Sequence, residues 1–447
     1  MMTMAGLLAA TAAMASPVAT VTSVTQAADL SVTVTYTLAD GPAVVTMDVE
    51  TKDANGVWKS IGGENVSGRC PPSGDVFKRV TGEGPHSFVW DPDFAWPGSD
   101  FVAGSDNVRI TVRAWAMDDT PDYMAVRLSS NETERVAWYP AAEYVPGGVL
   151  SNVAYRTGTL LMRRIHAKDV TWTMGTTNGK LWWIANHSPA HPVTLDHDYY
   201  IGVFQLTIAQ LYAVNTQKSL SQTYGESEGL MRPADGMSYG VLREGNLHTA
   251  VDPDHEWPNP PAETSIIAKF RKRLICAEFP QGLDIELPSE AEWEYACKAG
   301  VCNEMYWNNG ALIGNDAGNA DVIPGRCKGN QAVNATFHSP TVGPTNATAV
   351  CGSYAPNPWG LYDMHGNLWE TCLDWYADDI TALNGAVNAK GEYLADGTTK
   401  GEQRVSRGGS WREDSYASQS EFRQPRSPSD TGYSSSGVRF ACRAGLK

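Results

Sequence analysis

The amino-acid sequence changes character near residue 157, and this change requires at least two different folds in one chain. Before residue 128, apolar and polar residues alternate with a period of two in three runs, LSVTVTYTL (30–38), AVVTMDVET (43–51) and VRITVRAWAM (108–117). Turn residues such as Asp, Gly and Pro separate these runs. Runs of this kind, rich in Val, Thr and Ile, are typical of the strands of an antiparallel β-sandwich. We therefore predict a β-sandwich over residues 29–128, comparable to fibronectin-III domains in architecture only.

Beyond residue 157 the alternation fades, tryptophan becomes frequent, and Gly, Asn, Ser and Pro fill long stretches between short apolar segments. Two helices are still predicted, because Thr207 is followed three residues later by Gln210, and Ser289 by Glu292. In this capping-box pattern the side chain and the backbone at the helix start satisfy each other's unpaired groups. We predict a loop-rich α+β domain over 157–447, joined to the sandwich by a linker over 129–156.

The charge balance argues against two classes of partner. Asp and Glu number 50 against 34 Lys and Arg, which gives a net charge of −16. Nucleic acids and anionic membrane surfaces both bind basic faces, so neither is expected to be the main partner. No stretch after the N-terminus approaches the roughly 20 apolar residues of a membrane-spanning helix. We therefore expect a mature protein that does not span a membrane.

The first residues resemble a secretory signal. An apolar run from Ala5 to Ala15 contains or precedes A-x-A-like cleavage points near 13–15 and 27–28. The Lys or Arg that usually precedes such a run is missing, so a disordered or misassigned N-terminus is the alternative. We predict a signal peptide over 1–28, and a secreted, periplasmic or cell-surface location.

Several segments of the second part of the chain carry a resemblance to one family. They are VTWTMGTTNG (170–179) with HPVTLDHDYYIGVFQLTIAQLYAVN (191–215), LPSEAEWEYACKAG (287–300), NPWGLYDMHGNLWETCLDWY (357–376), and RVSRGGSW (404–411) with GVRFACRAG (437–445). In this order they resemble the sulfatase-modifying factors, the family of the formylglycine-generating enzymes, over residues 157–447. The resemblance implies a compact, loop-rich version of the C-type-lectin fold.

The chemistry of that family is not expected in this chain. The formylglycine-generating enzymes bind copper(I) through two cysteines shortly after the GGS-aromatic motif. The resemblance implies that the matching positions in this chain are Glu413 and Ser418. No cysteine lies between Cys372 and Cys442. Oxygen ligands do not replace thiolates for a soft ion such as copper(I), so no copper is expected. Another branch that shares this fold, the iron-dependent sulfoxide synthases, has an N-terminal helical domain that donates histidines in an HxxxHxE pattern. The N-terminal part of this chain is β-rich and contains no such pattern, so that iron chemistry is not expected either.

A calcium site is implied by the same resemblance. The family's liganding positions fall on Asp363, Gly366, Leu368 and Glu370, two of which would offer carboxylates and two backbone carbonyls. Such hard oxygen ligands are what calcium binds. The alternative is a tight turn whose carboxylates accept backbone N–H groups. A second family site resembles Asn319–Ala320, without further ligands that can be aligned.

A disulfide is implied as well. Seven of the eight cysteines lie after residue 270, and none forms a CxxC pair. The family often joins a cysteine of its second helix to one near its last strand, which here implies a bridge between Cys297 and Cys442. Two buried thiols are the alternative.

The closing segment REDSYASQSEFRQPRSPSDTGYSSSG (412–437) is a candidate ligand face. It is rich in Ser, Tyr, Arg and Asp, a composition favoured in antibody-type binding loops. The resemblance places it on the exposed face where the enzymes bind substrate peptides, and its composition resembles the variable region of diversity-generating-retroelement proteins. The alternative is a polar surface loop without a ligand. The candidate contact residues are Arg412, Glu413, Tyr416, Ser418, Phe422, Arg423, Arg426 and Tyr433.

These observations favour an exported, non-catalytic protein that binds a protein or glycan ligand through this segment. The first alternative is an enzyme of the same family with cysteine-independent oxidative or maturation chemistry on a peptide or small metabolite. The second is a structural surface adhesin.

Overall fold

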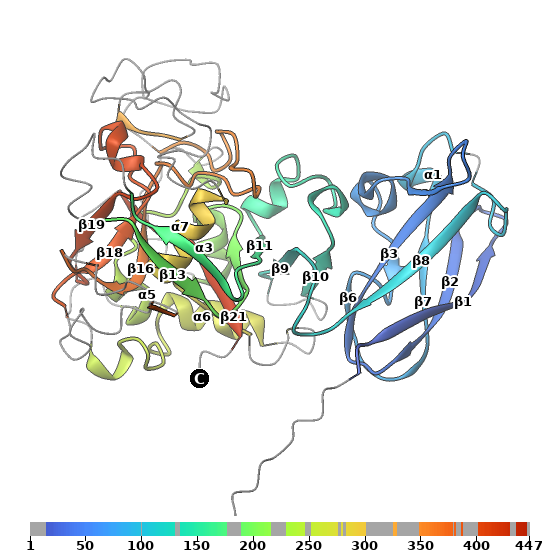
Figure 1. Ribbon diagram of the computed structural model, residues 1–447, viewed down its shortest axis with the longest axis horizontal. Helices are drawn as coiled ribbons and strands as arrows, with labels where there is room; N and C mark the ends of the chain where they lie inside the picture. Colours follow the sequence, from blue (N-terminus) through green and yellow to red (C-terminus); the bar gives the residue numbers. More distant parts are fainter. Residues whose placement is uncertain are drawn as a thin grey trace, which may run out of the picture. The chain divides into compact units, whose positions relative to one another are not determined.

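The computed structural model describes residues 15–99, 101–129, 135–176, 189–215, 229–245, 252–275, 279, 283–300, 325–328, 348–378, 380, 386–387, 401–429 and 435–444. The chain divides into two compact units (Figure 1). Unit 1 consists of Met1–Pro121 and Ala137–Val149, and unit 2 of Asp122–Val136 and Leu150–Lys447. None of the helices in the described part of the chain is long and apolar enough to cross a membrane.

Unit 1 contains two antiparallel sheets. One has the order β1 (Val18–Gln26), β2 (Val32–Ala39), β7 (Gly84–Trp90), β5 (Ser73–Gly74), and the other the order β4 (Trp58–Ser60), β3 (Ala43–Lys52), β6 (Lys78–Val80), with β8 (Val108–Trp115) also paired to β3. The three alternating runs of the sequence are β2, β3 and β8, so their prediction as strands is confirmed. In β2, Val32, Val34 and Tyr36 are buried while the residues between them are not.

Two strands of the N-terminal part lie at or beyond its predicted boundaries. Strand β1 lies before the boundary predicted at residue 28 and pairs along its whole length with β2. Of the two cleavage points considered, only the one near 13–15 would leave this strand in place. The segment predicted as a linker, 129–156, contains strand β10 (Val136–Tyr139), in which the Trp138 N–H donates to the Phe77 carbonyl at 2.9 Å.

The described residues of unit 2 form three sheets. Strand β9 belongs to this unit, although it lies within the range predicted for the sandwich, 29–128. The sheets are β9 (Tyr123–Arg127), β11 (Thr159–Ile165), β14 (Tyr199–Gly202), β21 (Ala441–Ala444) and β15 (Leu283–Glu286) in that order; β12 (Val170–Met174), β13 (His191–Leu195) and β17 (Ala386–Val387); and β19 (Arg423–Arg426), β18 (Arg404–Arg407), β16 (Trp369–Trp375) and β20 (Ser436–Gly437). With its few short helices, the unit is a mixed α and β structure in which strands dominate.

Both predicted helices are confirmed. They are α3 (Ile208–Val214) and α7 (Glu290–Lys298), and each begins with a complete capping box. The structure adds α5 (Tyr239–Arg243) and α6 (Ile266–Leu274). Helix α7 contacts β12, β16 and β18 (Figure 1), and its Trp293 and Cys297 are completely buried in the core cluster of the unit.

Helix α7 carries an ion network inside this core. All nine of its residues are buried, including three glutamates and one lysine. Each glutamate meets an arginine from a different strand, which ties β18, β19 and β21 to the helix. The pairs are Glu290–Arg423, Glu292–Arg443 and Glu294–Arg407. Buried charges are tolerated only when they are paired in this way, so the network fixes the helix relative to three strands.

Candidate functional site

The closing segment folds back on the sheet through a glycine turn. After β18 the chain passes Gly408 and Gly409, with φ of 92° and 74°, and then forms the 3-10 helix η9 (Ser415–Ser418) before β19 returns antiparallel to β18. A Cβ at Gly409 would lie 2.7 Å from the Ala417 carbonyl oxygen, so only glycine lets η9 approach this closely.

Five of the eight predicted contact residues are at least partly accessible, and we call them the closing face: Arg412, Glu413, Tyr416, Phe422 and Arg426. The Phe422 ring centroid lies 5.7 Å from that of Tyr416. The Arg412 guanidinium lies 5.1 Å from the Trp411 ring centroid. Glu413 accepts a hydrogen bond from the Ser410 hydroxyl and lies 3.9 Å from Arg426. The face therefore combines two aromatic rings with both signs of charge.

Two of the other three predicted contact residues are buried. Arg423 is 5% exposed, because its guanidinium pairs with Glu290 through two hydrogen bonds of 2.5 and 2.9 Å. Ser418 is completely buried, and its carbonyl oxygen accepts a hydrogen bond from His365 Nδ1 at 2.8 Å. Neither side chain is accessible in the described structure, so these two residues are not part of the closing face. Tyr433 lies outside the described residues.

The four predicted calcium ligands are brought together around one side chain. Nε2 of Gln205 lies 3.4 Å from the Asp363 carbonyl oxygen, 3.3 Å from that of Gly366, 2.9 Å from that of Leu368 and 2.9 Å from Glu370 Oε1. Gln205 itself is 1% exposed. No local pattern points to Gln205, since it lies between 158 and 165 residues away from these ligands along the chain.

The charges around this loop are only partly balanced. Glu370 receives Arg439 Nη2 at 2.8 Å and Trp293 Nε1 at 2.6 Å. Asp363 Oδ2 accepts the Gly352 N–H at 2.7 Å, as in the predicted alternative. Within the described structure, however, Asp363 Oδ1 and Gln205 Oε1 are buried without a hydrogen-bond partner. Burial raises the pKa of Asp363 to about 6.

This donor set fits a hard cation on one condition. Three carbonyl oxygens and two carboxylates are ligands of the kind that calcium binds. The amide nitrogen of Gln205 points at them, so an ion would require this amide to turn and offer its oxygen. The residues that resemble the second calcium site of the family, Asn319–Ala320, lie outside the described residues.

The predicted disulfide is absent, which corrects the Cys297–Cys442 prediction. Both residues are buried free thiols. Cys297 Sγ faces the loop after Leu361 and lies 3.8 Å from His365 Nε2, whereas Cys442 lies in β21 opposite Tyr200 and Ile285. Burial raises the pKa of both thiols well above its usual range.

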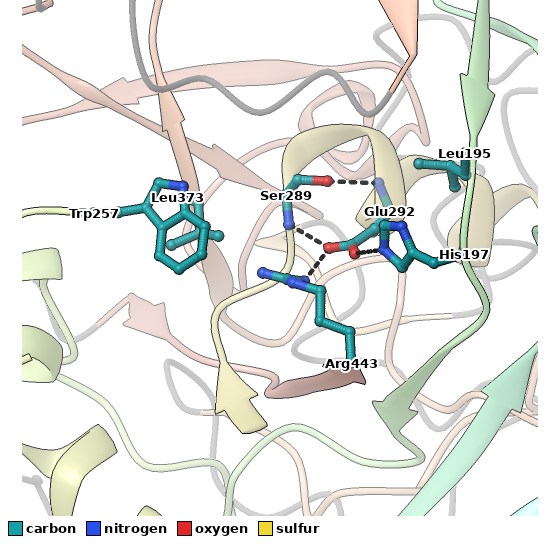
Figure 2. Close-up of a pocket in the computed structure, with 7 residues that line it drawn as sticks. All are labelled: Leu195, His197, Trp257, Ser289, Glu292, Leu373 and Arg443. Carbon is teal, nitrogen blue, oxygen red and sulfur yellow. Dashed lines mark hydrogen bonds and ion pairs between the residues drawn. The ribbon is translucent and has the colours of Figure 1, made fainter. Parts of the chain in front are cut away.

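A pocket near the start of α7 is held by charges that satisfy one another. Figure 2 shows the Glu292 carboxylate between the Ser289 backbone, the His197 ring and the Arg443 guanidinium. Glu292 accepts the Ser289 N–H at 2.7 Å and His197 Nε2 at 2.9 Å, in addition to the ion pair with Arg443. The remaining lining residues are apolar: Leu195, Trp257 and Leu373. This pocket therefore has a structural role.

The His197–Glu292 pair should make stability depend on pH. Burial favours the neutral imidazole, but Glu292 and Asp196 outweigh it and raise the pKa of His197 above 6.5. A raised folded-state pKa gives stability that is present below pH 6.5 and lost as the pH rises through the folded-state value. We expect His197→Gln to cost more stability at pH 6 than at pH 9 in urea unfolding. An equal loss at both pH values would contradict this assignment.

Unit 2 is a mixed α and β domain in which the buried helix α7 packs against β18, and the glycine turn follows β18. This combination defines a class of protein, and comparison with known families gives its name. Residues 153–444 match the family described as the sulfatase-modifying factor enzyme 1-like domain. The chain belongs to this family.

Individual relatives match over part of their length. A formylglycine-generating enzyme of Streptomyces coelicolor is 36% identical over 162 residues, which cover 35% of this chain and 45% of that protein. That of Mus musculus is 30% identical over 265 residues, covering 54% of this chain and 63% of that protein. The chain thus spans about half the length of these two relatives.

Solved structures are similar at low sequence identity. Treponema denticola variable protein 1 is 21% identical with a TM-score of 0.44, and PvdO from Pseudomonas aeruginosa is 22% identical with a TM-score of 0.43. Each alignment covers 64% of this chain and 95% of the other.

Proposed function

We propose that this protein is an exported, non-catalytic ligand-binding member of its family, and that the closing face binds a protein or a glycan. One observation carries the proposal: no cysteine lies between Cys372 and Cys442, and the family resemblance places the copper-binding cysteines of the formylglycine-generating enzymes at Glu413 and Ser418. The two sheets of unit 1 would pack as a β-sandwich that acts as a spacer, and unit 2 would adopt the C-type-lectin-like form of the family.

The surroundings of these two residues support this reading. The Glu413 carboxylate is engaged by the Ser410 hydroxyl and lies near Arg426. The Ser418 hydroxyl is buried and has no hydrogen-bond partner among the described residues. A carboxylate and an alcohol are hard oxygen ligands, and a soft copper(I) ion selects sulfur. Glu413 and Ser418 would therefore not bind copper(I) as the two cysteines of the enzymes do.

The composition of the closing face supports binding. The rings of Tyr416 and Phe422 lie next to each other. The guanidinium of Arg412 lies over the Trp411 ring, and that of Arg426 over the Trp369 ring. Aromatic side chains and arginine dominate binding energy at protein interfaces, because they supply a large contact area with few rotatable bonds.

The double variant Tyr416→Ala/Phe422→Ala is expected to weaken ligand binding at least tenfold, since each ring would act as a central anchor. The ligand is found by screening a glycan array and an extracellular protein library with calcium present, and affinity is then measured for both proteins. Phe94→Ala is the control, because Phe94 is 70% exposed but lies in unit 1. Unchanged binding by the double variant would place the ligand elsewhere.

The enzymatic alternative is separated by a second experiment. Purified protein is assayed for copper and iron, for oxygen consumption, and for aldehyde formation on a cysteine peptide derived from a sulfatase. Stoichiometric redox metal together with turnover would overturn the binding proposal. Ordered self-assembly without any ligand would instead indicate an adhesin. A neighbouring reverse transcriptase, with a template copy of the closing segment that differs at adenines, would mark that segment as hypervariable.

Calcium is part of the proposal. We expect the carbonyls of Asp363, Gly366 and Leu368, with Glu370 and the turned amide of Gln205, to hold the ion. At a calcium concentration 100 times the Kd, binding adds about 2.7 kcal/mol to stability. This corresponds to a rise in Tm of about 5 °C over protein in EDTA. Gln205→Leu should abolish the rise, and equal Tm values for the natural protein in both conditions would exclude the ion.

A further inference from the structure

One end of unit 1 exposes three large apolar side chains that the proposed function does not use. Phe94, in the short helix α1 (Pro92–Ala95), is 70% exposed. Val102 lies between α1 and β8 and is 58% exposed, and Leu30 lies between β1 and β2 and is 46% exposed. Single exposed apolar residues need no explanation, whereas a group of them with a polar rim marks an interaction site.

Leu30 and Val102 are brought together by one side chain. The amide nitrogen of Gln26 donates to the carbonyl oxygens of Leu30 and Phe101, at 3.3 Å in each case. Its amide oxygen accepts the N–H of Ala103 at 3.1 Å. Val102 stands between the two loop residues that Gln26 binds, so it lies beside the turn that carries Leu30.

Phe94 lies at the same end of the unit. Trp90, the last residue of β7, pairs with Val32, the first residue of β2, so α1 begins beside the turn that precedes β2. The Trp90 ring also meets that of Phe101 edge to face, with the two centroids 5.2 Å apart. Figure 1 shows α1 at one end of the strands of unit 1. The three apolar side chains are therefore grouped at this end.

The backbone of Leu30 has a conformation that does not favour leucine. Its φ is 68°, and its N–H donates to the Ala27 carbonyl at 3.0 Å, as in the last position of a hairpin turn. Glycine or asparagine is favoured at such positions, because the left-handed conformation costs other residues about 1–2 kcal/mol. A leucine that is both strained and exposed has no local benefit for the fold, which favours a role in contact with another molecule.

The charges beside these side chains are negative. Segments 27–31 and 91–107 contain no Lys or Arg. Their exposed aspartates and apolar residues form a surface that we call the acidic tip: Asp29, Leu30, Asp93, Phe94, Val102 and Asp106. Three basic residues that border it are each engaged by another group: Arg69 by Glu64 at 2.7 Å, Arg109 by Glu50 at 2.6 Å, and Lys52 by the Trp58 ring at 4.9 Å. The acidic tip therefore combines apolar area with negative charge.

We propose that the acidic tip is a second binding surface, and that it takes a protein segment whose apolar side chains are flanked by lysine or arginine. Phe94 would be the central apolar contact, and the aspartates would attract the cations of the partner. A second copy of this chain would set aspartate against aspartate, and an anionic membrane would be repelled by the same charges. This surface goes beyond the proposed function, in which unit 1 is a spacer and the ligand lies on unit 2.

The test uses short random peptides displayed on phage. They are selected on the full-length protein and then depleted on the Phe94→Ala protein, which removes every peptide that binds elsewhere. The remaining peptides are expected to combine Leu, Phe or other large apolar residues with an excess of Lys and Arg over Asp and Glu. The most enriched peptide is synthesised, and its Kd is measured by fluorescence anisotropy.

Phe94→Ala should weaken binding of this peptide at least tenfold, and Val102→Ala several-fold. Val18→Ala is the matched control, because Val18 is 53% exposed and lies at the far end of β1, where it pairs with Ala39. Asp93→Asn/Asp106→Asn should also weaken binding several-fold. Raising the salt concentration from 0.1 to 1 M should have a similar effect, because the Debye length falls from about 10 to about 3 Å.

Leu30→Asn separates binding from a structural role. Asparagine suits the φ of 68°, so the Tm should stay the same or rise while the peptide binds several-fold more weakly. An unchanged Kd in Phe94→Ala, no peptide left after depletion, or enriched peptides without an excess of basic residues would overturn the proposal. Dimerisation of the natural protein that Phe94→Ala abolishes would also overturn it, since the occupant would be a second copy.

The outcome does not depend on the closing face. Tyr416→Ala/Phe422→Ala, which tests the proposed function, is here a control and should bind the peptide as the natural protein does. Loss of the peptide in this variant would place it on unit 2 and reject the acidic tip. A glycan or protein ligand lost only in this variant would retain the closing face, whatever the peptides show for the tip.

Discussion

Replacing Arg407 with methionine is expected to lower the free energy of unfolding by about 3–5 kcal/mol. Arg407 is completely buried, where it pairs with Glu294, lies 3.4 Å from Glu290 and donates to the Phe422 carbonyl at 2.7 Å. Methionine preserves most of the volume but leaves the glutamates without this cation. Among the described residues, Glu294 then keeps Lys298, at 2.7 Å, as its charged partner. An uncompensated charge in the core is the main reason for the large loss.

The measurement is urea unfolding followed by tryptophan fluorescence, since Trp293 lies 5.3 Å from the Arg407 guanidinium. Lys272→Met is the matched control, because Lys272 forms an exposed ion pair with Glu263 and should change stability by less than about 1 kcal/mol. Adding Glu294→Leu to the Arg407 variant should recover part of the loss. A loss below about 1 kcal/mol for Arg407→Met would mean that the α7 ion network is not needed for stability.

Replacing Gly409 with alanine is the second change with a large expected effect, about 2–5 kcal/mol. Its φ of 74° disfavours any side chain by about 1–2 kcal/mol. The added Cβ would also lie 2.7 Å from the Ala417 carbonyl oxygen and 2.5 Å from Ser418 Oγ. Relieving this overlap requires η9 to move away from β18, at a further cost of about 1–3 kcal/mol. The closing face should lose ligand affinity together with stability.

Gly300→Ala separates the two contributions in the same unit. Gly300 has a φ of 78°, but a Cβ there would meet only the Trp359 ring, at an ordinary 3.6 Å. This variant should lose only the roughly 1–2 kcal/mol of backbone strain and keep its ligand affinity. Comparable losses of stability and affinity in both variants would show that contact with η9 is not what requires glycine at 409.

The sequence predicted those features whose signals are local. Both capping boxes lie within four residues, and α3 and α7 begin where they were expected. The period-two runs of unit 1 became strands for the same reason. In contrast, alternation does not tell to which sheet a strand belongs, so β9 was assigned to the wrong unit.

The features that were missed depend on contacts between distant residues. Arg423 was predicted on the surface because its neighbours are polar, but its partner Glu290 lies 133 residues away. The disulfide prediction followed a family pattern that says nothing of side-chain direction, and Cys297 faces His365 instead of β21. Leu30 and Val102 lie far apart along the chain, and only the contacts of one glutamine side chain show that they lie at the same end of unit 1.

The division of the chain has a practical consequence for anyone who wishes to express one unit alone. The backbone enters unit 2 at Asp122, returns to unit 1 at Ala137 and leaves it again after Val149. A fragment that starts at Leu150 would lack β9 and leave an edge of β11 without its partner, an invitation to aggregate. Neither unit corresponds to one uninterrupted stretch of coding sequence, so truncation at a single position damages at least one of them.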